Sequence, residues 1–466
     1  MGNSKLTGTL NGARLMGEVS VVLIAGALSG NALAQCDAWH AMDEGMSGAV
    51  DALTVYNGPL IAGGSFTRAG GQEANRIARW TWGAGWLPFD PVGMNGDVYA
   101  LTVYNGELIA AGAFTTAGGQ SASRIARWNG IDWQALGSGI DGDVYTLAVY
   151  NNELIAGGFF ASAGGQSTSR IARWNGSTWA PLGAGMDWPV SALTVYDGDL
   201  IAGGGFTSPA NRIARWNGSS WSALGSGMNN TVYSLAVYDG DLIAGGQFTQ
   251  AGNQNASRVA RWNGSAWSAL GSGANNTVNA MLVYGGDLIA GGDFTMAGGS
   301  GANRVARWNG SAWSALGAGT NGSVADLTLW DNQLIAGGAF TMAEGRSANR
   351  AAHWQDCGGA GPQLTVAATC PSGGPIRIEW SGATPNGQIA LIFARNIGSF
   401  IIPNQYPCAG TPLGLGSNQI QLAFQGGAGS NGSRVLNATT GPAACGGYLQ
   451  LLDLPTCGTS NVARVE

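Results

Sequence analysis

Four short runs of apolar and β-branched residues recur along most of the chain, and the set occurs seven times. In order they read V-x-x-L-x-V-Y, L-I-A-G-G-x-F, R-I-A-R-W and W-x-x-L-G, as in Asp143–Met186. The second run begins at Leu60, Leu108, Leu154, Leu200, Leu242, Leu288 and Leu334. A period in the forties indicates one supersecondary unit per repeat. The β-branched and aromatic residues, with glycines between the runs, predict strands rather than helices.

Turn residues separate the runs within each repeat. Asn-Gly or Asp-Gly joins the first run to the second at Asn57-Gly58, Asn105-Gly106, Asp197-Gly198 and Asp239-Gly240. Such pairs accept positive φ at both central positions and therefore favour tight type I′ hairpins. Asn-Gly also follows the third run at Asn129, Asn175, Asn217, Asn263 and Asn309. Each repeat thus predicts a four-stranded antiparallel meander, and seven of them predict an all-β, seven-bladed β-propeller.

The first and last repeats predict how the ring closes. The seventh repeat stops at Trp354 without its W-x-x-L-G run, and Trp39–Met46 resembles that missing run. An open array would leave bare sheet edges, so we expect the N-terminal strand to complete the seventh blade. Cys36 precedes Trp39 by three residues and Cys357 follows Trp354 by three. We predict a Cys36–Cys357 disulfide there, with pairing to the C-terminal cysteines as the alternative.

Glycine and tryptophan recur at fixed places in the repeat. The Ala-Gly-Gly of the second run predicts close approach of neighbouring blades near the axis. Two tryptophans per repeat are expected to fill the wider outer part of each blade, with carbohydrate stacking as the alternative. The pairs are Trp80/Trp86, Trp128/Trp133, Trp174/Trp179, Trp216/Trp221, Trp262/Trp267, Trp308/Trp313 and Trp354/Trp39.

These motifs resemble known propeller repeats. The double-Gly strand resembles the kelch and galactose-oxidase central-domain group, although the outer strands depart from the kelch pattern. The sequence I-A-G-G-x-F-T followed by W-x-x-L-G-x-G is similar to repeats of the fungal cortical-marker surface proteins. The resemblance covers residues 35–357. It implies the fold and leaves the activity open.

The regions outside the repeats predict export and a second domain. Residues 1–34 carry Lys5 and Arg14, an apolar run at 21–28 and an Ala32-Leu33-Ala34 cleavage pattern, which is typical of a signal peptide. We therefore predict a secreted, periplasmic or cell-surface protein without a membrane span. Residues 358–362 form a linker, and residues 363–466 contain strand-like runs that predict a small β-sandwich.

The C-terminal region also contains four cysteines. They are Cys370, Cys408, Cys445 and Cys457, which allow three connectivities. Disulfides are consistent with export into an oxidising compartment. Our preferred pairing is Cys370–Cys457 with Cys408–Cys445.

Composition excludes several classes of function. Of the 466 residues, 45% are hydrophobic and 10% charged, so extensive disorder is excluded. The net charge is -6, which argues against nucleic acid as a partner. His40 and His353 are the two histidines of the chain, too few for a galactose-oxidase-like copper site, and we expect them to be cross-strand neighbours. The sequence assigns no catalytic residue, metal ligand or cofactor.

Two repeated polar sets have both a structural and a functional interpretation. Seven arginines open the third run, and we expect them to serve blade geometry by stacking on Trp or pairing with Asp, with anion binding as the alternative. They are Arg76, Arg124, Arg170, Arg212, Arg258, Arg304 and Arg350. Asn95-Gly96-Asp97 and Asp141-Gly142-Asp143 lie in inter-blade loops and suggest calcium, but a full D-x-D-x-D-G loop is lacking.

The predicted function is recognition rather than catalysis. The loops between the second and third runs vary in length and share one face with the inter-blade loops, and loops on a rigid scaffold usually carry binding. We predict an exported, non-catalytic recognition or structural protein that binds a protein or glycan through this face. The alternative is an extracellular carbohydrate-active hydrolase or lyase with an axial pocket. Clustered Asp, Glu and Tyr at the axis would favour the enzyme, and a smooth channel without unusual carboxylates would favour binding.

Overall fold

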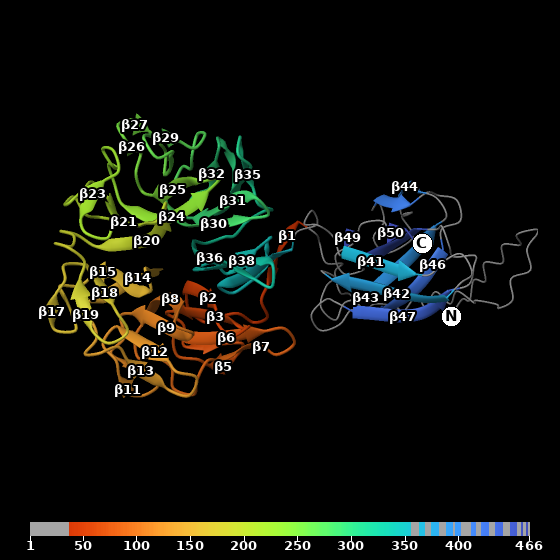
Figure 1. Ribbon diagram of the computed structural model, residues 1–466, viewed down its shortest axis with the longest axis horizontal. Helices are drawn as coiled ribbons and strands as arrows, with labels where there is room; N and C mark the ends of the chain where they lie inside the picture. Colours follow the sequence, from red (N-terminus) through yellow and green to blue (C-terminus); the bar gives the residue numbers. More distant parts are fainter. Residues whose placement is uncertain are drawn as a thin grey trace, which may run out of the picture. The chain divides into compact units, whose positions relative to one another are not determined.

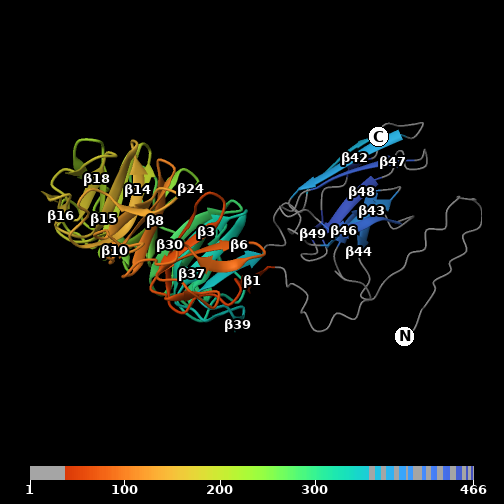
Figure 2. The ribbon, with the colours of Figure 1, turned by 90° about the horizontal axis from the view of Figure 1, so that it is seen from below.

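The computed structural model describes residues 37–355 in full and, beyond them, the backbone of ten strands between residues 363 and 464. Seven four-stranded antiparallel sheets form the blades of a β-propeller (Figure 1). In each sheet the strand formed by the V-x-x-L-x-V-Y run, called the first strand of the blade, lies innermost in the ring. Figure 2 shows the same sheets turned by 90°. This confirms the all-β, seven-bladed architecture that the repeats predict.

The blades follow one another along the chain. Blade 1 contains β2 (Val50–Val55), β3 (Leu60–Gly64), β6 (Ile77–Thr81) and β7 (Gly85–Pro88). Blade 2 contains β8 (Val98–Tyr104), β9 (Glu107–Gly112), β12 (Ile125–Trp128) and β13 (Trp133–Ala135). Blade 3 contains β14 (Asp143–Tyr150), β15 (Glu153–Phe159), β18 (Ile171–Trp174) and β19 (Trp179–Pro181). Blade 4 contains β20 (Val190–Tyr196), β21 (Asp199–Gly204), β22 (Ile213–Trp216) and β23 (Trp221–Ala223).

The remaining blades have the same order of strands. Blade 5 contains β24 (Val232–Tyr238), β25 (Asp241–Gly246), β28 (Val259–Trp262) and β29 (Trp267–Ala269). Blade 6 contains β30 (Val278–Tyr284), β31 (Asp287–Gly292), β34 (Val305–Trp308) and β35 (Trp313–Ala315). Blade 7 contains β36 (Val324–Trp330), β37 (Gln333–Gly338), β40 (Ala351–Gln355) and, from the other end of the chain, β1 (Ala38–Ala41).

Six of the seven blades have an additional small hairpin at the same end of the ring. Each lies between the second and third strands of its blade. They are β4/β5 (Arg68–Ala69, Gln72–Glu73), β10/β11 (Thr116–Ala117, Gln120–Ser121), β16/β17 (Ser162–Ala163, Gln166–Ser167), β26/β27 (Gln250–Ala251, Gln254–Asn255), β32/β33 (Met296–Ala297, Ser300–Gly301) and β38/β39 (Met342–Ala343, Arg346–Ser347). We call this end, together with the inter-blade loops that share it, the loop face. Blade 4 has no such hairpin.

The predicted turns form as their residues require. Asn105 and Gly106 have φ of 50° and 79°, which matches the type I′ hairpin expected between β8 and β9. The second set of Asn-Gly turns uses a different device. Gly130 has a φ of 98°, and the Oδ1 atom of Asn129 accepts hydrogen bonds of 2.9 Å from the backbone N–H groups of Ile131 and Asp132. The asparagine side chain therefore closes this turn.

The tryptophan pairs are registered across the outer two strands of each blade. Their ring centroids lie 5.3 to 5.6 Å apart. All are buried except Trp128 and Trp221, which are half-buried. The fourth-strand Trp also bonds to the preceding blade: the Nε1–H of Trp179 donates to the carbonyl of Leu136 at 2.9 Å. Packing between blades, rather than ligand stacking, therefore accounts for these tryptophans.

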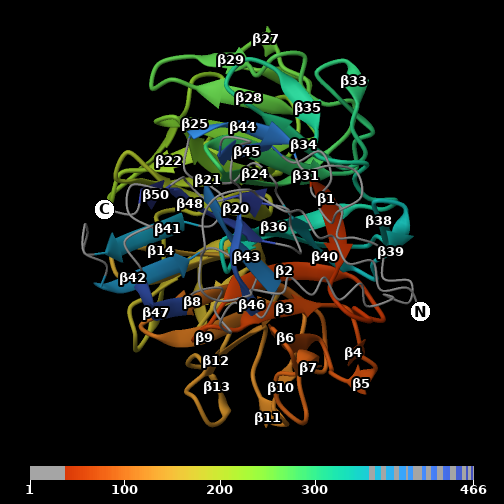
Figure 3. The ribbon, with the colours of Figure 1, turned by 90° about the vertical axis from the view of Figure 1, so that its right-hand side faces the viewer.

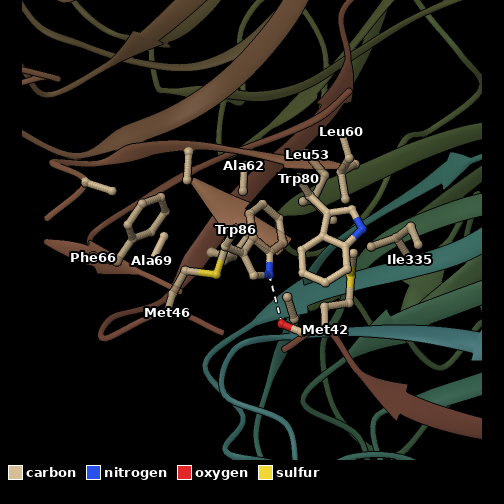
Figure 4. Packing of buried hydrophobic residues seen from close by; sticks show 14 of the residues in the cluster. Met42, Met46, Leu53, Leu60, Ala62, Phe66, Ala69, Trp80, Trp86 and Ile335 are labelled. Atoms are coloured by element: carbon tan, nitrogen blue, oxygen red, sulfur yellow. Dashed lines mark hydrogen bonds between the residues drawn. The ribbon is translucent and has the colours of Figure 1, made fainter. Parts of the chain in front are cut away.

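The N-terminal strand β1 pairs with β40 in blade 7 (Figure 3). The register places Trp39 opposite Trp354 and His40 opposite His353, so the two histidines are cross-strand neighbours as predicted. Met42 follows β1 at the place of the leucine in W-x-x-L, and its carbonyl accepts a 3.0 Å hydrogen bond from Trp86 of blade 1 (Figure 4). Cys36 and Cys357 lie outside the described residues, as do the other four cysteines.

Glycines allow neighbouring blades to approach closely. A Cβ on Gly203 would lie 2.6 Å from the Cγ1 atom of Val232 in the next blade. We expect Gly203→Ala to lower the free energy of unfolding by about 1–3 kcal/mol, because valine has little rotamer freedom to move away. Gly301→Ala is the matched control, since nothing lies within 4 Å of its Cβ position. Equal stability of the two variants in urea unfolding would contradict this account.

The strands beyond residue 362 form sheets of their own. β41 (Gln363–Ala368), β42 (Gly374–Ser381) and β47 (Arg434–Thr440) pair in one antiparallel sheet. A second sheet contains β43 (Gln388–Ala394), β46 (Gln421–Gly427), β48 (Tyr448–Asp453), β49 (Gly458–Thr459) and β50 (Ala463–Arg464). β44 (Ile397–Ile401) pairs with β45 (Pro412–Leu415). The domain boundaries and the sandwich packing remain predictions.

Candidate functional site: an axial cavity lined by all seven blades

A cavity of about 300 Å³ lies among the first strands of the seven blades. Its lining begins at the second residue of the V-x-x-L-x-V-Y run and takes in the next one or two residues of each strand. These positions lie near the start of the strand, next to the inter-blade loop that precedes it. The cavity is therefore at the loop-face end of the axis, where the sequence predicts binding.

A β-bulge in every first strand positions the lining residues. In blade 1 the pairing with β3 shifts between Val50 and Ala52, and Asp51 is the extra residue. A bulge re-aims side chains that simple alternation would place on opposite faces, so residues 51 and 52 both line the cavity. The bulged residues around the ring are Asp51, Tyr99, Tyr145, Ser191, Tyr233, Asn279 and Ala325.

Two carboxyl groups give the cavity an unusual charge state. Burial, with a smaller contribution from the charge of Asp97, raises the pKa of Asp51 from 3.8 to about 6. Burial raises the pKa of Asp326 from 3.8 to about 7, and Asp51 adds to this shift. Hydrogen bonds from the backbone N–H groups of Leu53 and Leu327, of 2.7 and 2.8 Å, partly oppose it. Both carboxyl groups therefore titrate within about one pH unit of neutrality.

Tyrosines line the cavity beside these carboxyl groups. The rings of Tyr99 and Tyr145 lie 5.8 Å apart between centroids. Burial, followed by the charge of Asp97, raises the pKa of Tyr99, and burial followed by Asp143 raises that of Tyr145. Both phenols therefore keep their protons at neutral pH and can donate hydrogen bonds to a ligand.

The arginines that open the third strands fasten the loops around the cavity. All seven have positive φ, between 65° and 73°. Arg76 and Arg124 form ion pairs with Asp97 and Asp143 of the next blade, at 3.0 and 3.5 Å. Arg170 donates instead to the carbonyl of Phe160 in its own loop, at 2.9 Å. These contacts agree with the structural interpretation of the repeated arginine.

The repeated Asn or Asp of the inter-blade loops also has a structural role. The Oδ1 atom of Asp141 accepts hydrogen bonds of 2.9 Å from the backbone N–H groups of Ala161 and Ser162. Asn95 does the same for Thr115 and Thr116, at 2.8 Å. An amide performs this role as well as a carboxylate, so loop capping explains the residues that suggested calcium. Within the described residues, no three His, Cys, Asp or Glu side chains gather as metal ligands would.

The outer faces of blades 2 to 6 each carry an ion pair that blade 7 lacks. Arg127 pairs with Glu107 at 3.3 Å, and the corresponding pair of blade 3 is Arg173–Glu153 at 3.2 Å. Blade 7 places His353 at the position of the arginine and Gln333 at that of the acid. His353 stacks on His40 with centroids 5.4 Å apart, and burial followed by His40 lowers its pKa to about 4. The neutral imidazole is therefore part of the blade packing.

Sequence reasoning missed the residues that line the cavity. Apart from the Leu or Met of V-x-x-L in five blades, they are the two variable positions of that run, which the repeat pattern leaves unspecified. Their variation from Asp to Tyr, Ser and Asn inside an otherwise repeated run is the signal that could have identified them. The content of the cavity matches the half of our criterion that favours an enzyme, because two aspartates and three tyrosines gather at the axis, although the lining contains no Glu.

Two family models support the propeller assignment. The family model described as the Rax2 C-terminal beta propeller domain matches residues 90–239. A beta-propeller domain of unknown function, DUF5122, matches residues 57–80, 239–265 and 286–310. The solved beta-propeller domain of Cps50 (Swd1) from Myceliophteria thermophila is similar, with 12% identity and a TM-score of 0.42, over 68% of this chain and 99% of that chain. The comparison with curated proteins gave no match.

These matches confirm the relation to β-propeller repeats, and the specific kelch or galactose-oxidase relation stays a prediction. Separately, none of the elements that the structure describes is a helix long and apolar enough to span a bilayer.

Proposed function

We propose that this chain is an exported recognition protein that binds a protein or glycan at the loop face, with the axial cavity as its central subsite. The observation that carries the proposal is the convergence of side chains from the first strands of all seven blades on one cavity of about 300 Å³. A scaffold that repeats its core residues and varies those of the cavity is suited to selective binding. The N-terminal export pattern and the cysteines support a secreted, periplasmic or cell-surface location.

The same proposal gives the termini of the ring a role. In this proposal the pairing of β1 with β40 would close the circle, and a Cys36–Cys357 disulfide would hold it closed covalently. The strands beyond residue 362 would form the attached β-sandwich, held by the other two disulfides. Peptide mapping without reductant tests these pairings, and a free thiol at Cys36 or Cys357 would contradict the covalent closure.

Binding is tested by a glycan array and a pull-down with the full-length protein and Asp51→Asn. Asp51 is largely ionised above its pKa of about 6, so removing its charge should weaken binding at pH 8 by roughly tenfold. Asp239→Asn is the matched control, because Asp239 is an exposed hairpin residue whose φ of 52° asparagine also adopts. Unchanged binding by Asp51→Asn, or no ligand in either screen, would contradict the proposed site.

A carbohydrate-active enzyme is the second candidate. The observation that favours it is the pair of carboxyl groups with pKa values of about 6 and 7, since a general acid needs a proton near neutral pH. The backbone hydrogen bonds to both oxygens of Asp326 argue for a structural carboxyl instead. Cleavage of an oligosaccharide by the wild type that is lost in Asp51→Asn would establish the enzyme.

A further inference from the structure

Two exposed aromatic side chains lie together on the loop face. Trp188 is 57% exposed and Phe159 is 46% exposed, and they are the large aromatic residues left open to solvent among residues 37–355. Their ring centroids lie 6.0 Å apart. Exposed aromatic pairs of this kind are typical of binding surfaces, because solvent-exposed rings add little to the stability of the hydrophobic core.

Departures from the repeat create this aromatic platform, which consists of Phe159 and Trp188. Trp188 occupies an inter-blade loop position that holds glycine or asparagine in every other repeat. It fits because Gly205 lies beneath it: a Cβ there would be 2.5 Å from the Cδ1 atom of Trp188. The guanidinium carbon of Arg170 lies 4.8 Å from the Phe159 ring centroid and braces that ring.

The loop face is open beside the platform. Blade 4 replaces the small hairpin of the other six blades with a short connection through Ser208-Pro209. Residues 207 to 209 are exposed, and the Oδ1 atom of Asp187 fixes the connection by accepting from the N–H of Thr207 at 2.8 Å. The missing hairpin and the exposed Trp188 thus occur in the same repeat.

Both platform residues are close to cavity residues along the chain or across a strand pair. Trp188 precedes Ser191, a cavity residue, by three positions, and Phe159 pairs in register with Asp143, two residues before the cavity residue Tyr145. A ligand in contact with the platform can therefore extend one unit toward hydroxyl, amide and carboxyl groups. The face of a pyranose ring packs on aromatic rings through its C–H groups, while its hydroxyls need such hydrogen-bond partners.

Resting on the proposed function, we infer that Trp188 and Phe159 stack against a pyranose ring of an uncharged oligosaccharide whose neighbouring unit enters the axial cavity. Asp51 and Asp326 disfavour an acidic sugar in that cavity. A peptide with an apolar side chain would find few apolar walls there, because Asp, Tyr, Ser and Asn provide most of the bulged positions. The platform therefore provides the stacking surface for the sugar ring, and the cavity provides hydrogen-bond partners that select between sugars by their hydroxyl groups.

The test titrates neutral hexasaccharides into the full-length protein by calorimetry. The set contains β1,4-linked glucose, β1,3-linked glucose, β1,4-linked N-acetylglucosamine and α-linked mannose. At least one should bind, and Trp188→Ala should weaken its binding about tenfold or more, or about 1.4 kcal/mol. Trp188→Phe keeps an aromatic face and should stay within about threefold of the wild type. Ile131→Ala is the control, since Ile131 is 81% exposed and lies in the turn between β12 and β13 of blade 2.

The outcomes separate this inference from the proposed function. Hexasaccharide binding that falls in Asp51→Asn but not in Trp188→Ala overturns the platform and leaves the cavity as the site. A protein ligand lost in Asp51→Asn, with no hexasaccharide bound, overturns the glycan assignment and leaves the proposed function. If neither kind of ligand binds, both are overturned.

Discussion

Replacing Trp39 by alanine should lower the free energy of unfolding of the propeller by about 3–5 kcal/mol. Trp39 is 1% exposed, and its ring lies 5.5 Å from that of Trp354 between centroids. Its Nε1–H donates to the carbonyl of Leu316 in blade 6 at 3.0 Å, so the variant also leaves a buried acceptor unpaired. Chemical denaturation followed by circular dichroism measures the loss.

A matched variant separates ring closure from the loss of one tryptophan. Trp179 has the same role in blade 3, with its partner ring 5.4 Å away and a 2.9 Å hydrogen bond to Leu136. Its strand β19 is held beside β18 by a short hairpin, whereas β1 meets β40 from the opposite end of the described chain. Trp39→Ala should therefore also increase amide hydrogen exchange in β40, and Trp179→Ala should not do so in β18.

Equal destabilisation by the two variants, with no change in exchange along β40, would contradict closure by β1. Trp188→Ala provides the surface control, since an exposed side chain should alter stability by no more than about 0.5 kcal/mol.

The repeat determines most of the fold because its information is local. Asn105-Gly106 selects a hairpin, Trp174 and Trp179 meet through the register of adjacent strands, and Trp39 is recognisable as a stray copy of the fourth run. Each of these follows from strand alternation and turn geometry. Because the pattern repeats, the same prediction applies to every blade of the ring.

The site is harder to predict because it depends on departures from alternation. Buried Val50 and Leu53 are three residues apart, a spacing that a regular strand with period two does not give. An extra residue is required, and this bulge brings residues 51 and 52 to the axis. Burial at the axis raises the pKa of Asp326, and backbone N–H groups from two blades partly oppose that rise. No local sequence pattern reports either effect.

Stability should fall as the pH rises from about 4 to about 7, because the raised pKa values of two half-buried carboxyl groups outweigh the lowered pKa of half-buried His353. Asp51 and Asp326 titrate at about 6 and about 7 in the folded protein against an ordinary 3.8. They keep protons that the unfolded chain has released, so their contribution is lost with rising pH. His353 acts in the opposite direction: its pKa is about 4 against an ordinary 6.5, so its contribution is lost as the pH falls.

Because these effects oppose each other, the slope of the free energy of unfolding against pH reports how many of the three groups have a displaced pKa. Between pH 4 and 6 the folded state holds two extra protons on the carboxyl groups, and the unfolded state holds one extra on histidine. The net proton corresponds to a fall on the order of 1 kcal/mol per pH unit. Asp51→Asn removes one carboxyl proton and should make this range nearly flat. His353→Gln removes the opposing group and should approximately double the slope.

Urea unfolding at half-unit intervals between pH 4 and 8 measures these slopes. Asp239→Asn, at an exposed hairpin, should leave the slope unchanged. A slope that is the same in the wild type, Asp51→Asn and His353→Gln would show that these groups titrate alike in the folded and unfolded chains. In that case the cavity is open to water and its carboxyl groups are ordinary. The fall in stability toward pH 7 is therefore the thermodynamic signature of the partial burial of Asp51 and Asp326 at the axis.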